Sequence, residues 1–405
     1  MTMIQRRHFL RGAGALACSA AAHPFLTTVT LAASDGGRPL GDHRLVVILL
    51  RGAMDGLDVV QPQGDRGFAA LRPTLNRPDA LPLDGFFALN PALGGLMPLW
   101  QAGQLGFVHA TSTPYRDKRS HFDGQDQLEA GTGNDLALAS VRDGWLNRLL
   151  QAVPGVRAET AYAVGREEMR ILSGPAQVRD WAPDTRLDLS PQARRLLEQV
   201  YHDDPAFLAV ANEAMELGID LDAEPAGMQA PMPELAGARL ADVEELVGFV
   251  TARLRAETRI AAFSLNGWDT HKAQKTGIGR SLSRLERAIL RLSQRLGPEI
   301  WGKTVVLAMT EFGRTAAENG SGGTDHGTAG AMLLAGGAVR GGKIWGDWPG
   351  LDEADLYDRR DLLPTSDVRV WAAHVIAGLY GIDRATLESA IFPGMQMGQV
   401  PGLIL

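Results

Sequence analysis

The sequence predicts an α/β protein with a mostly parallel central sheet and helices on both faces of that sheet. Residues Arg44–Arg51 read RLVVILLR, a continuous β-branched and leucine run of the kind that is buried on both faces of a parallel sheet. Similar short apolar runs recur along the chain, and stretches with helical periodicity separate them. This alternation of strands and helices indicates a layered α/β arrangement.

The apolar runs and the helical stretches define the predicted elements in order. After the first strand, further strands are predicted at residues 105–110, 160–165, 259–265, 303–310 and 329–336. Helices are predicted at residues 91–101, 122–130, 143–152, 191–217, 240–258, 278–296 and 368–381. Residues 216–238 are rich in proline, glycine and acids, which predicts a loop between two helices. With neither an internal repeat nor a clean break, we expect a single domain over residues 44–394.

The composition is that of a soluble globular protein. Of 405 residues, 45% are hydrophobic and 21% are charged, and the 47 glycines follow no period, which argues against a collagen-like or low-complexity chain. The formal net charge is −7, and losing an N-terminal segment with three arginines and no acid would take it to about −10. This acidic balance argues against nucleic acid as a partner.

The N-terminus has the features of a twin-arginine signal peptide. Arg6 and Arg7 precede the small apolar run at residues 12–22, and the sequence LAAS follows at residues 31–34. The run is too short to span a bilayer, for which about 20 apolar residues are needed. We therefore predict a signal peptide over residues 1–33, export by the twin-arginine machinery, and a periplasmic or secreted protein without a stable transmembrane segment. An amphipathic N-terminal helix with incidental arginines is the alternative.

The single cysteine, Cys18, lies inside this predicted signal peptide. A mature chain cut near Ala32 or Ala33 would carry no thiol and could form no disulfide. Ala15, Leu16 and Ala17 before Cys18 are a loose match to a lipid-attachment site, so lipid attachment is the alternative to cleavage.

Polar residues follow several predicted strands, where open α/β sheets bind their ligands. Asp55 follows the first strand and is a candidate metal ligand, although aspartate is also a common turn residue. Ser120, after the second strand, is either an N-cap of the next helix or a nucleophile at its N-terminus. Asp269 and His271 lie two residues apart, so in an extended segment both can face one metal ion.

A long glycine-rich loop between two predicted strands contains the largest group of candidates. Glu311, Asp325 and His326 offer the oxygen and imidazole donors that zinc, manganese or magnesium bind. Arg314 is placed to clamp an anion such as phosphate or sulfate. A flexible surface loop is the alternative, but a simple hairpin needs only about 2 to 5 loop residues.

These segments resemble the domain of unknown function 1501 family, which is grouped with sulfatases and alkaline phosphatases. The resemblance runs from about Leu45 to Pro393. Its motifs are LLRGAMDGLDVVQP from Leu49, RSHFDGQDQLEAGT from Arg119, DGWLNRLL from Asp143, GWDTH from Gly267, MTEFGRTAAENGSGGTDHGTAG from Met309, and the closing WGDWPGL and FPG. The resemblance implies an alkaline phosphatase-like three-layer sandwich.

By position, the resemblance also implies roles for individual residues. Ser120 matches the nucleophile of phosphoryl or sulfuryl transfer, and the metal ligands match Asp55, Asp269, His271, Glu311 and His326. Phe312 occupies the place of a metal-binding histidine, so Asp325 replaces that ligand, or the site holds one metal or none.

Two functions are compatible with this sequence. The first is an exported hydrolase that uses a divalent metal, namely zinc, manganese, magnesium or calcium, and acts on a small anionic phosphate or sulfate ester. The second is a non-catalytic periplasmic binding or assembly protein that keeps the fold with a degraded metal site.

Overall fold

The structure is a computed structural model that describes residues 40–116, 118–133, 141–165, 169–182, 240–399 and 402–405. The predicted signal peptide with Cys18, the predicted helix at residues 191–217 and the predicted loop at residues 216–238 lie outside these residues. Within them, no helix is both long enough and apolar enough to cross a membrane.

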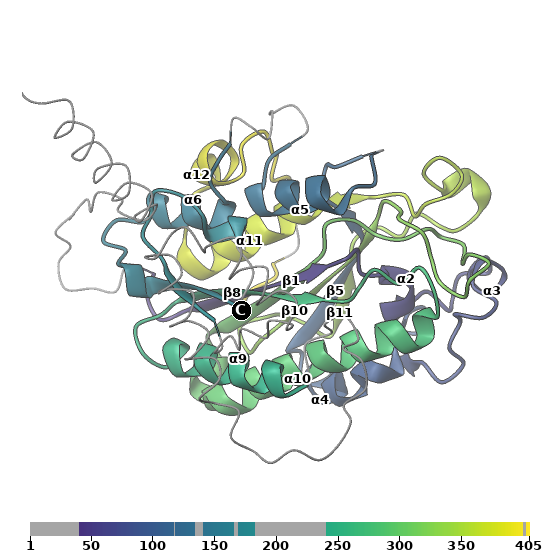
Figure 1. Cartoon of the computed structure of the whole chain (residues 1–405), viewed down its shortest axis with the longest axis horizontal. Coiled ribbons are helices and arrows are strands. Elements are labelled where there is room, and N and C mark those ends of the chain that lie inside the picture. Colours follow the sequence, from purple (N-terminus) through teal and green to yellow (C-terminus); the bar gives the residue numbers. More distant parts are fainter. Residues whose placement is uncertain (1–39, 117, 134–140, 166–168, 183–239, 400–401) are drawn as a thin grey trace, which may run out of the picture.

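A nine-stranded sheet forms the centre of the protein (Figure 1). Its strands are β1 (Arg44–Arg51), β5 (Leu105–Ser112), β6 (Ala161–Val164), β7 (Arg179–Trp181), β8 (Ile260–Asn266), β9 (Thr304–Met309), β10 (Gly330–Ala335), β11 (Lys343–Trp345) and β12 (Ser366–Asp367). They lie in the order β11-β5-β10-β9-β1-β8-β6-β7, with β12 beside β5. Only β10 runs antiparallel to its neighbours in this sheet, so the prediction of a mostly parallel sheet is confirmed.

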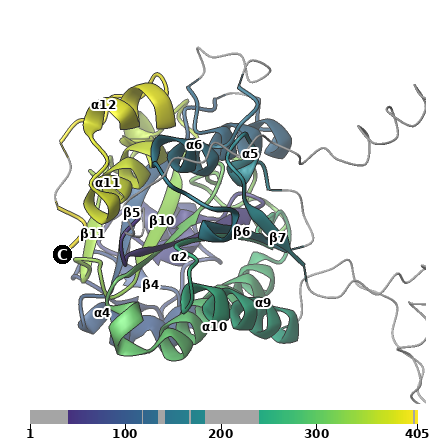
Figure 2. The same cartoon turned by 90° about the vertical axis from the view of Figure 1, so that its left-hand side faces the viewer.

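Helices cover both faces of the sheet (Figures 1 and 2). One face carries α5 (His121–Ala130), α6 (Trp145–Ala152), α11 (Val368–Tyr380) and α12 (Arg384–Thr386), and the other carries α4 (Met97–Gln101), α9 (Leu240–Leu254) and α10 (Gln274–Trp301). Successive residues of β1 serve opposite cores, because side chains alternate along a strand. Val47 packs in the core with α6 and α11, and Val46 in the core with α9 and α10. This explains why the strand is apolar from Leu45 to Leu50.

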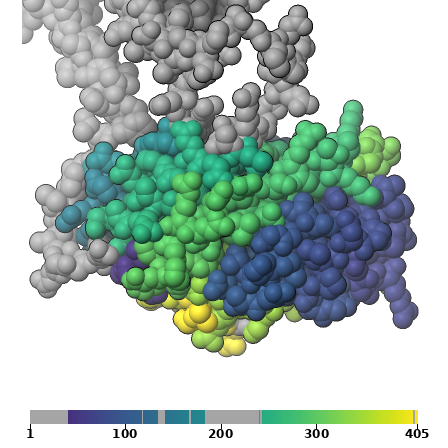
Figure 3. Space-filling view, turned by 90° about the horizontal axis from the view of Figure 1, so that it is seen from below, coloured from purple at the N-terminus to yellow at the C-terminus, as the bar shows by residue number. Residues whose placement is uncertain are grey.

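The predicted helices within the described residues are present, but some begin, end or divide at other residues than expected. The predicted helix at residues 91–101 divides into a 3-10 helix, η1 (Pro91–Leu96), and α4, which has its own proline at Pro98. Helix α10 begins four residues earlier than predicted and continues to Trp301 through a kink at Gly297 and Pro298. η1 packs against α10, and this lower face is seen directly in Figure 3.

Short helices and a small second sheet lie in the segments between the strands of the central sheet. The segment after β1 contains α2 (Gly56–Val59), α3 (Phe68–Leu71) and a three-stranded sheet of β2 (Val60–Gln61), β4 (Ala88–Leu89) and β3 (Leu81–Pro82). The others are η3 (Ala158–Thr160), η4 (Arg170–Leu172), η5 (Glu353–Asp355) and η6 (Leu387–Ile391). The strands β1, β5, β8 and β9 run in the same direction, so their carboxyl ends lie at the same edge of the sheet.

Candidate metal centre

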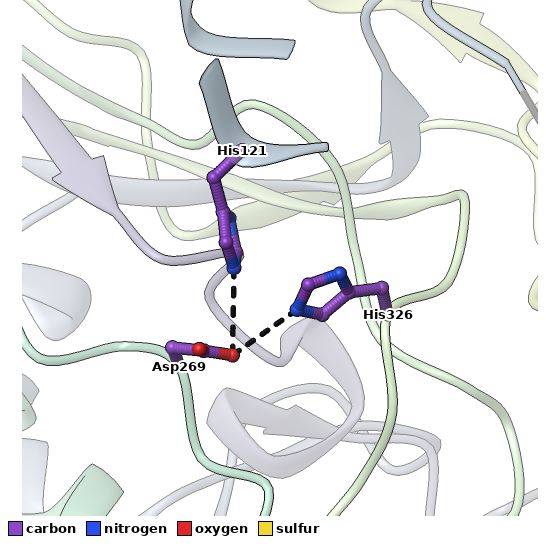
Figure 4. A group of neighbouring side chains, drawn as sticks. All are labelled: His121, Asp269 and His326. Atoms are coloured by element: carbon purple, nitrogen blue, oxygen red, sulfur yellow. Dashed lines mark hydrogen bonds and ion pairs between the residues drawn. The ribbon is translucent and has the colours of Figure 1, made fainter. Parts of the chain in front are cut away.

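Two loops and the start of a helix at this edge bring histidine and aspartate side chains to one point (Figure 4). His121 is the first residue of α5, Asp269 follows β8, and His326 precedes β10. One ligand atom from each lies within 4.8 Å of the other two. Nε2 of His121 is 3.5 Å from Oδ1 of Asp269, and Nε2 of His326 is 3.2 Å from the same oxygen. Both imidazoles therefore point at one carboxylate oxygen.

His271 extends this group to a fourth side chain. Its Nε2 lies 3.1 Å from Oδ1 of Asp269 and 3.0 Å from Nε2 of His326. His121, Asp269, His271 and His326 together are called the histidine–aspartate cluster below. Three imidazole nitrogens thus surround one carboxylate oxygen, a donor set of the kind that binds transition metals.

The outer nitrogen of each imidazole is held by an acceptor. Nδ1 of His121 lies 2.8 Å from Oε1 of Glu311, and Nδ1 of His271 lies 3.2 Å from Oδ1 of Asp325. Nδ1 of His326 lies 2.8 Å from the carbonyl oxygen of Arg119. Ionised carboxylates and carbonyls only accept hydrogen bonds, so each Nδ1 that bonds to one of them carries a proton, and loss of any proton on Nε2 would leave that nitrogen as the metal ligand. Metal-binding histidines are oriented in the same way.

The electrostatics of the cluster favour a cation. Burial opposes ionisation of Asp269, but hydrogen bonds from His121, His326 and Arg314 outweigh it and hold the pKa of Asp269 well below its usual range. Partial burial lowers the pKa of His121, yet hydrogen bonds to Asp269 and Glu311 raise it on balance to about 9. Nε2 of His121 is buried, and its contact with Oδ1 of Asp269 is long, at 3.5 Å. The cluster therefore offers negative charge and a weakly bonded nitrogen, which a metal ion would satisfy.

Glu311 and Asp325, both predicted as metal ligands, contact histidines of the cluster. Glu311 is buried, and its Oε1 accepts hydrogen bonds from the backbone N–H groups of Gly52 and Ala53 as well as contacting His121. Gly52 has a φ of 117°, and a Cβ there would lie 2.6 Å from the backbone nitrogen of Asp269. Glycine thus lets the loop after β1 approach Asp269. In this geometry both acids hold histidines of the cluster through Nδ1.

Asp55 and Arg314 are placed differently from their expected roles. Asp55 is buried in an ion pair with Arg72, 2.7 Å between Oδ2 and a guanidinium nitrogen, and it also caps α2, so its carboxylate is used for structure. Arg314 is fully buried and donates hydrogen bonds to the carbonyl oxygens of Gly52, Ala53, Trp268 and Thr324. It also lies 2.5 Å from Oδ1 of Asp269. A buried guanidinium with these partners positions Asp269 and cannot clamp an incoming anion.

Ser120 is the N-cap of α5 and is next to the cluster in the chain. Its Oγ accepts a hydrogen bond from the backbone N–H of Asp123 at 3.4 Å, and its own backbone N–H donates to the Tyr115 hydroxyl at 2.7 Å. The residue before Ser120 contacts His326, and the residue after it belongs to the cluster. The capping interpretation therefore holds, and the serine also borders the candidate metal centre.

His121 is the cluster residue that the sequence did not identify as a ligand. A histidine at the start of a helix does not indicate metal binding by itself. Phe312 stacks on it, with ring centroids 5.2 Å apart and an interplanar angle of 17°. The aromatic residue in the place of an expected ligand thus packs against a histidine that comes from another loop.

We expect the Glu311→Gln substitution to lower metal affinity by about 10- to 100-fold, as is typical when the carboxylate behind a metal-binding histidine is changed. Glutamine retains an acceptor for Nδ1 of His121 but loses the charge that strengthens the imidazole as a donor. Competition with a chromogenic chelator measures the affinity. Since Glu311 also binds the loop at Gly52 and Ala53, unfolding of the metal-free variant is compared with that of the metal-free parent. Unchanged affinity would refute the orienting role.

Solved structures similar to this chain come from the alkaline phosphatase superfamily and from periplasmic domains. A protein in the alkaline phosphatase superfamily from Vibrio parahaemolyticus is 11% identical with a TM-score of 0.39, and the match covers 91% of this chain and 75% of that one. The C-terminal periplasmic domain of EcEptC from Escherichia coli is 11% identical with a TM-score of 0.40, covering 89% and 88%. Alkaline phosphatase from the Antarctic bacterium TAB5 is 11% identical with a TM-score of 0.34, covering 73% and 91%.

Structural similarity at this low level carries no information about substrate or reaction. No curated protein matches the chain. In contrast, a family model described as "Protein of unknown function (DUF1501)" matches residues 42–389. This span contains the whole histidine–aspartate cluster and all of the sequence motifs from which the same family was predicted except the closing FPG. The chain therefore belongs to the DUF1501 family of proteins of unknown function.

Proposed function

We propose that this protein is an exported metal-dependent hydrolase of phosphate or sulfate esters. The observation that carries the proposal is the convergence of three imidazole Nε2 atoms on Oδ1 of Asp269, each imidazole being oriented through Nδ1. Evolved metal sites combine such inner ligands with outer acceptors. A buried salt-bridge network has no need of three imidazoles directed at one carboxylate oxygen.

The donor set favours a transition metal over a hard cation. Calcium and magnesium prefer oxygen ligands, whereas imidazole nitrogens suit zinc and other first-row transition metals. His121, Asp269, His271 and His326 would hold the ion, with Glu311 and Asp325 behind two of the histidines. A bound ion of this kind would polarise the ester and offset its negative charge.

Ser120 is the proposed nucleophile. Its hydroxyl stands at the N-terminus of α5, where helix N–H groups and the helix dipole favour negative charge. In the proposed reaction Oγ loses its proton and bonds to phosphorus or sulfur, while the ester bond to the alcohol breaks and the alcohol leaves protonated. Water then cleaves the seryl ester, returning a proton to Oγ and releasing phosphate or sulfate. Because Arg314 is buried, the anion must be bound by other groups.

Replacing Ser120 by alanine is expected to lower turnover of p-nitrophenyl phosphate or p-nitrophenyl sulfate on the order of 10³-fold, as when a nucleophile is removed. Metal content is expected to stay stoichiometric, since Ser120 is not in the cluster. Loss of the N-cap also costs about 1 kcal/mol of stability, which a thermal unfolding curve reports. Ser283→Ala, on the exposed side of α10, is the control. Full turnover in Ser120→Ala would exclude the serine as nucleophile.

A non-catalytic periplasmic binding or assembly protein is the second candidate. Phe312 favours it, because this ring lies against Tyr115 and His121 in place of a metal-binding histidine. Stoichiometric metal without turnover of either p-nitrophenyl ester would support this function over the hydrolase. Export through the twin-arginine route is common to both candidates and is supported by Arg6 and Arg7. Cell fractionation tests it.

A further inference from the structure

A pocket beside the histidine–aspartate cluster has a shape and lining suited to a small ligand. Its volume is about 270 Å³, close to the lower limit of small-molecule sites. Leu71, Ala317 and Leu356 give it an apolar surface, and Asn319, Asp325 and Arg359 are among the polar residues that line it. It is called the Arg359 pocket below. Such a mixture of apolar surface and few polar groups is typical of binding sites.

Asp325 and Asn319 of the Arg359 pocket contact His271 of the cluster. Asp325 lines the pocket, and its Oδ1 contacts Nδ1 of His271. Asn319 donates hydrogen bonds to the backbone oxygen of His271 at 3.0 Å and to Oδ1 of Asp325 at 3.1 Å. Gly323 allows this approach, because a Cβ there would lie 2.3 Å from the carbonyl carbon of His271. The pocket lining and the cluster therefore meet at Asp325 and His271.

The charged side chains around the pocket differ in how many hydrogen bonds and ion pairs they make with other residues of the protein. Glu318 accepts hydrogen bonds from the backbone N–H groups of Thr74 and Leu75, and Asp325 is bonded to Asn319 and His271. Arg360 donates to Asp361 at 2.8 Å and to the carbonyl oxygen of His326 at 3.1 Å. Arg359 is 79% exposed, and its contact with Glu353 is 3.5 Å long between two exposed side chains. Arg359 is thus the charge most readily available to a ligand.

The turn that presents Arg359 is strained and firmly held. Asp358 and Arg359 both have a positive φ, 51° and 53°, a conformation that costs energy in residues other than glycine. Hydrogen bonds between the backbones of Tyr357 and Asp361 close the turn, and the backbone N–H of Ala316 donates to the carbonyl of Arg360. Strained residues that persist in such a frame often belong to ligand-binding clamps.

We propose that the Arg359 pocket binds the non-reacting part of the substrate, an aryl or short acyl group that ends in a second anionic group paired with Arg359. The inference rests on the proposed function for the position of the reacting ester at the cluster. The apolar surface formed by Leu71, Ala317 and Leu356 would contact the ring or chain, and Arg359 would select for the terminal charge. Doubly anionic esters would therefore be preferred over singly anionic ones.

Two phosphonates that cannot be hydrolysed test this proposal without relying on turnover. Phenylphosphonate and 4-phosphonobenzoate differ by one carboxylate, and calorimetry on the full, metal-loaded protein measures the binding of each. Since an exposed ion pair contributes up to about 1 kcal/mol, we expect 4-phosphonobenzoate to bind about three- to fivefold more tightly. Arg359→Gln should remove this preference and leave phenylphosphonate binding unchanged, while Arg359→Lys should retain part of it.

Two further variants define the location of the ligand. Ala317 is exposed at the pocket, so Ala317→Phe should block it and weaken both phosphonates without disturbing the core. Arg179→Gln removes an exposed arginine that pairs with Glu159 outside the pocket and should change neither affinity. Equal binding of the two phosphonates by the parent protein, or a preference that survives Arg359→Gln, would overturn the proposal.

The outcomes also separate this proposal from the proposed function. A carboxylate preference that depends on Arg359, without turnover of any ester, would support the pocket and contradict the hydrolase. Turnover of p-nitrophenyl esters with no carboxylate preference would support the hydrolase and contradict the pocket.

Discussion

Asp269→Asn is expected to abolish stoichiometric metal binding. Oδ1 of Asp269 is the atom that His121, His271 and His326 share, and asparagine removes its negative charge while leaving its size unchanged. A neutral amide is a weaker ligand for a divalent ion than a carboxylate is. It would also leave the buried guanidinium of Arg314 without its partner charge. Elemental analysis of the purified protein measures the loss.

His121→Ala and His326→Ala should lose metal in the same way, because each removes one Nε2 from the cluster. His374→Ala is the matched control, since this histidine is half-buried and its Nε2 contacts the carbonyl of Met397 far along the chain from any cluster residue. A ligand that binds only the folded state stabilises it, so a chelator should lower the melting temperature of the parent and of His374→Ala, but not of the cluster variants. Full metal content in both Asp269→Asn and His121→Ala would exclude this metal centre.

The strands were predictable because burial on both faces leaves a simple mark in the sequence. β1 has the predicted bounds, and the other predicted strands differ by a few residues at their ends. The antiparallel direction of β10 was not predictable in this way. An apolar run looks the same whichever way the strand runs, and the direction depends on the path of the loop that contains Asp325 and His326.

The positions of candidate residues were easier to predict than their partners. Asp269, His271 and His326 follow or precede strands that end at one edge, and the structure brings these three together. Asp55 also follows a strand, but Arg72, seventeen positions later, neutralises it in the interior. Local sequence does not reveal such a contact. His121 was missed for the converse reason, since its ligand role depends on Asp269 and Glu311 in distant loops.

The role of Arg314 was also not predictable from the local sequence. An arginine in a glycine-rich loop is equally suited to bind an anion or to join backbone carbonyls, and the sequence contains no sign of burial at that point. In the structure the carbonyls of three loops surround it. Its guanidinium therefore determines how the loops after β1 and β8 are arranged, and with them the position of Asp269.

The Arg72→Met substitution is expected to destabilise the protein by about 3–5 kcal/mol, because it leaves the buried carboxylate of Asp55 without its cation. Methionine has a similar length and fills much of the same space. The carbonyl oxygens of Thr315 and Ala316 would also lose the hydrogen bonds that Arg72 donates. Denaturant unfolding of the metal-free protein measures the free energy without a contribution from bound metal. The double variant Asp55→Asn with Arg72→Met should recover part of the loss, because no buried charge remains unpaired.

The pH dependence of this loss provides an independent check. Burial raises the pKa of Asp55, but the charge and hydrogen bonds of Arg72 outweigh it and leave the pKa below its ordinary value. In the parent, stability from this pair is therefore present above the unfolded pKa and lost as the pH falls through the folded pKa. Without Arg72, burial raises the pKa of Asp55, and protonation on acidification relieves the cost of the buried charge. The difference in unfolding free energy between the parent and Arg72→Met should therefore shrink as the pH is lowered. A difference that stays constant with pH would mean that lost packing, rather than an unpaired Asp55, causes the destabilisation.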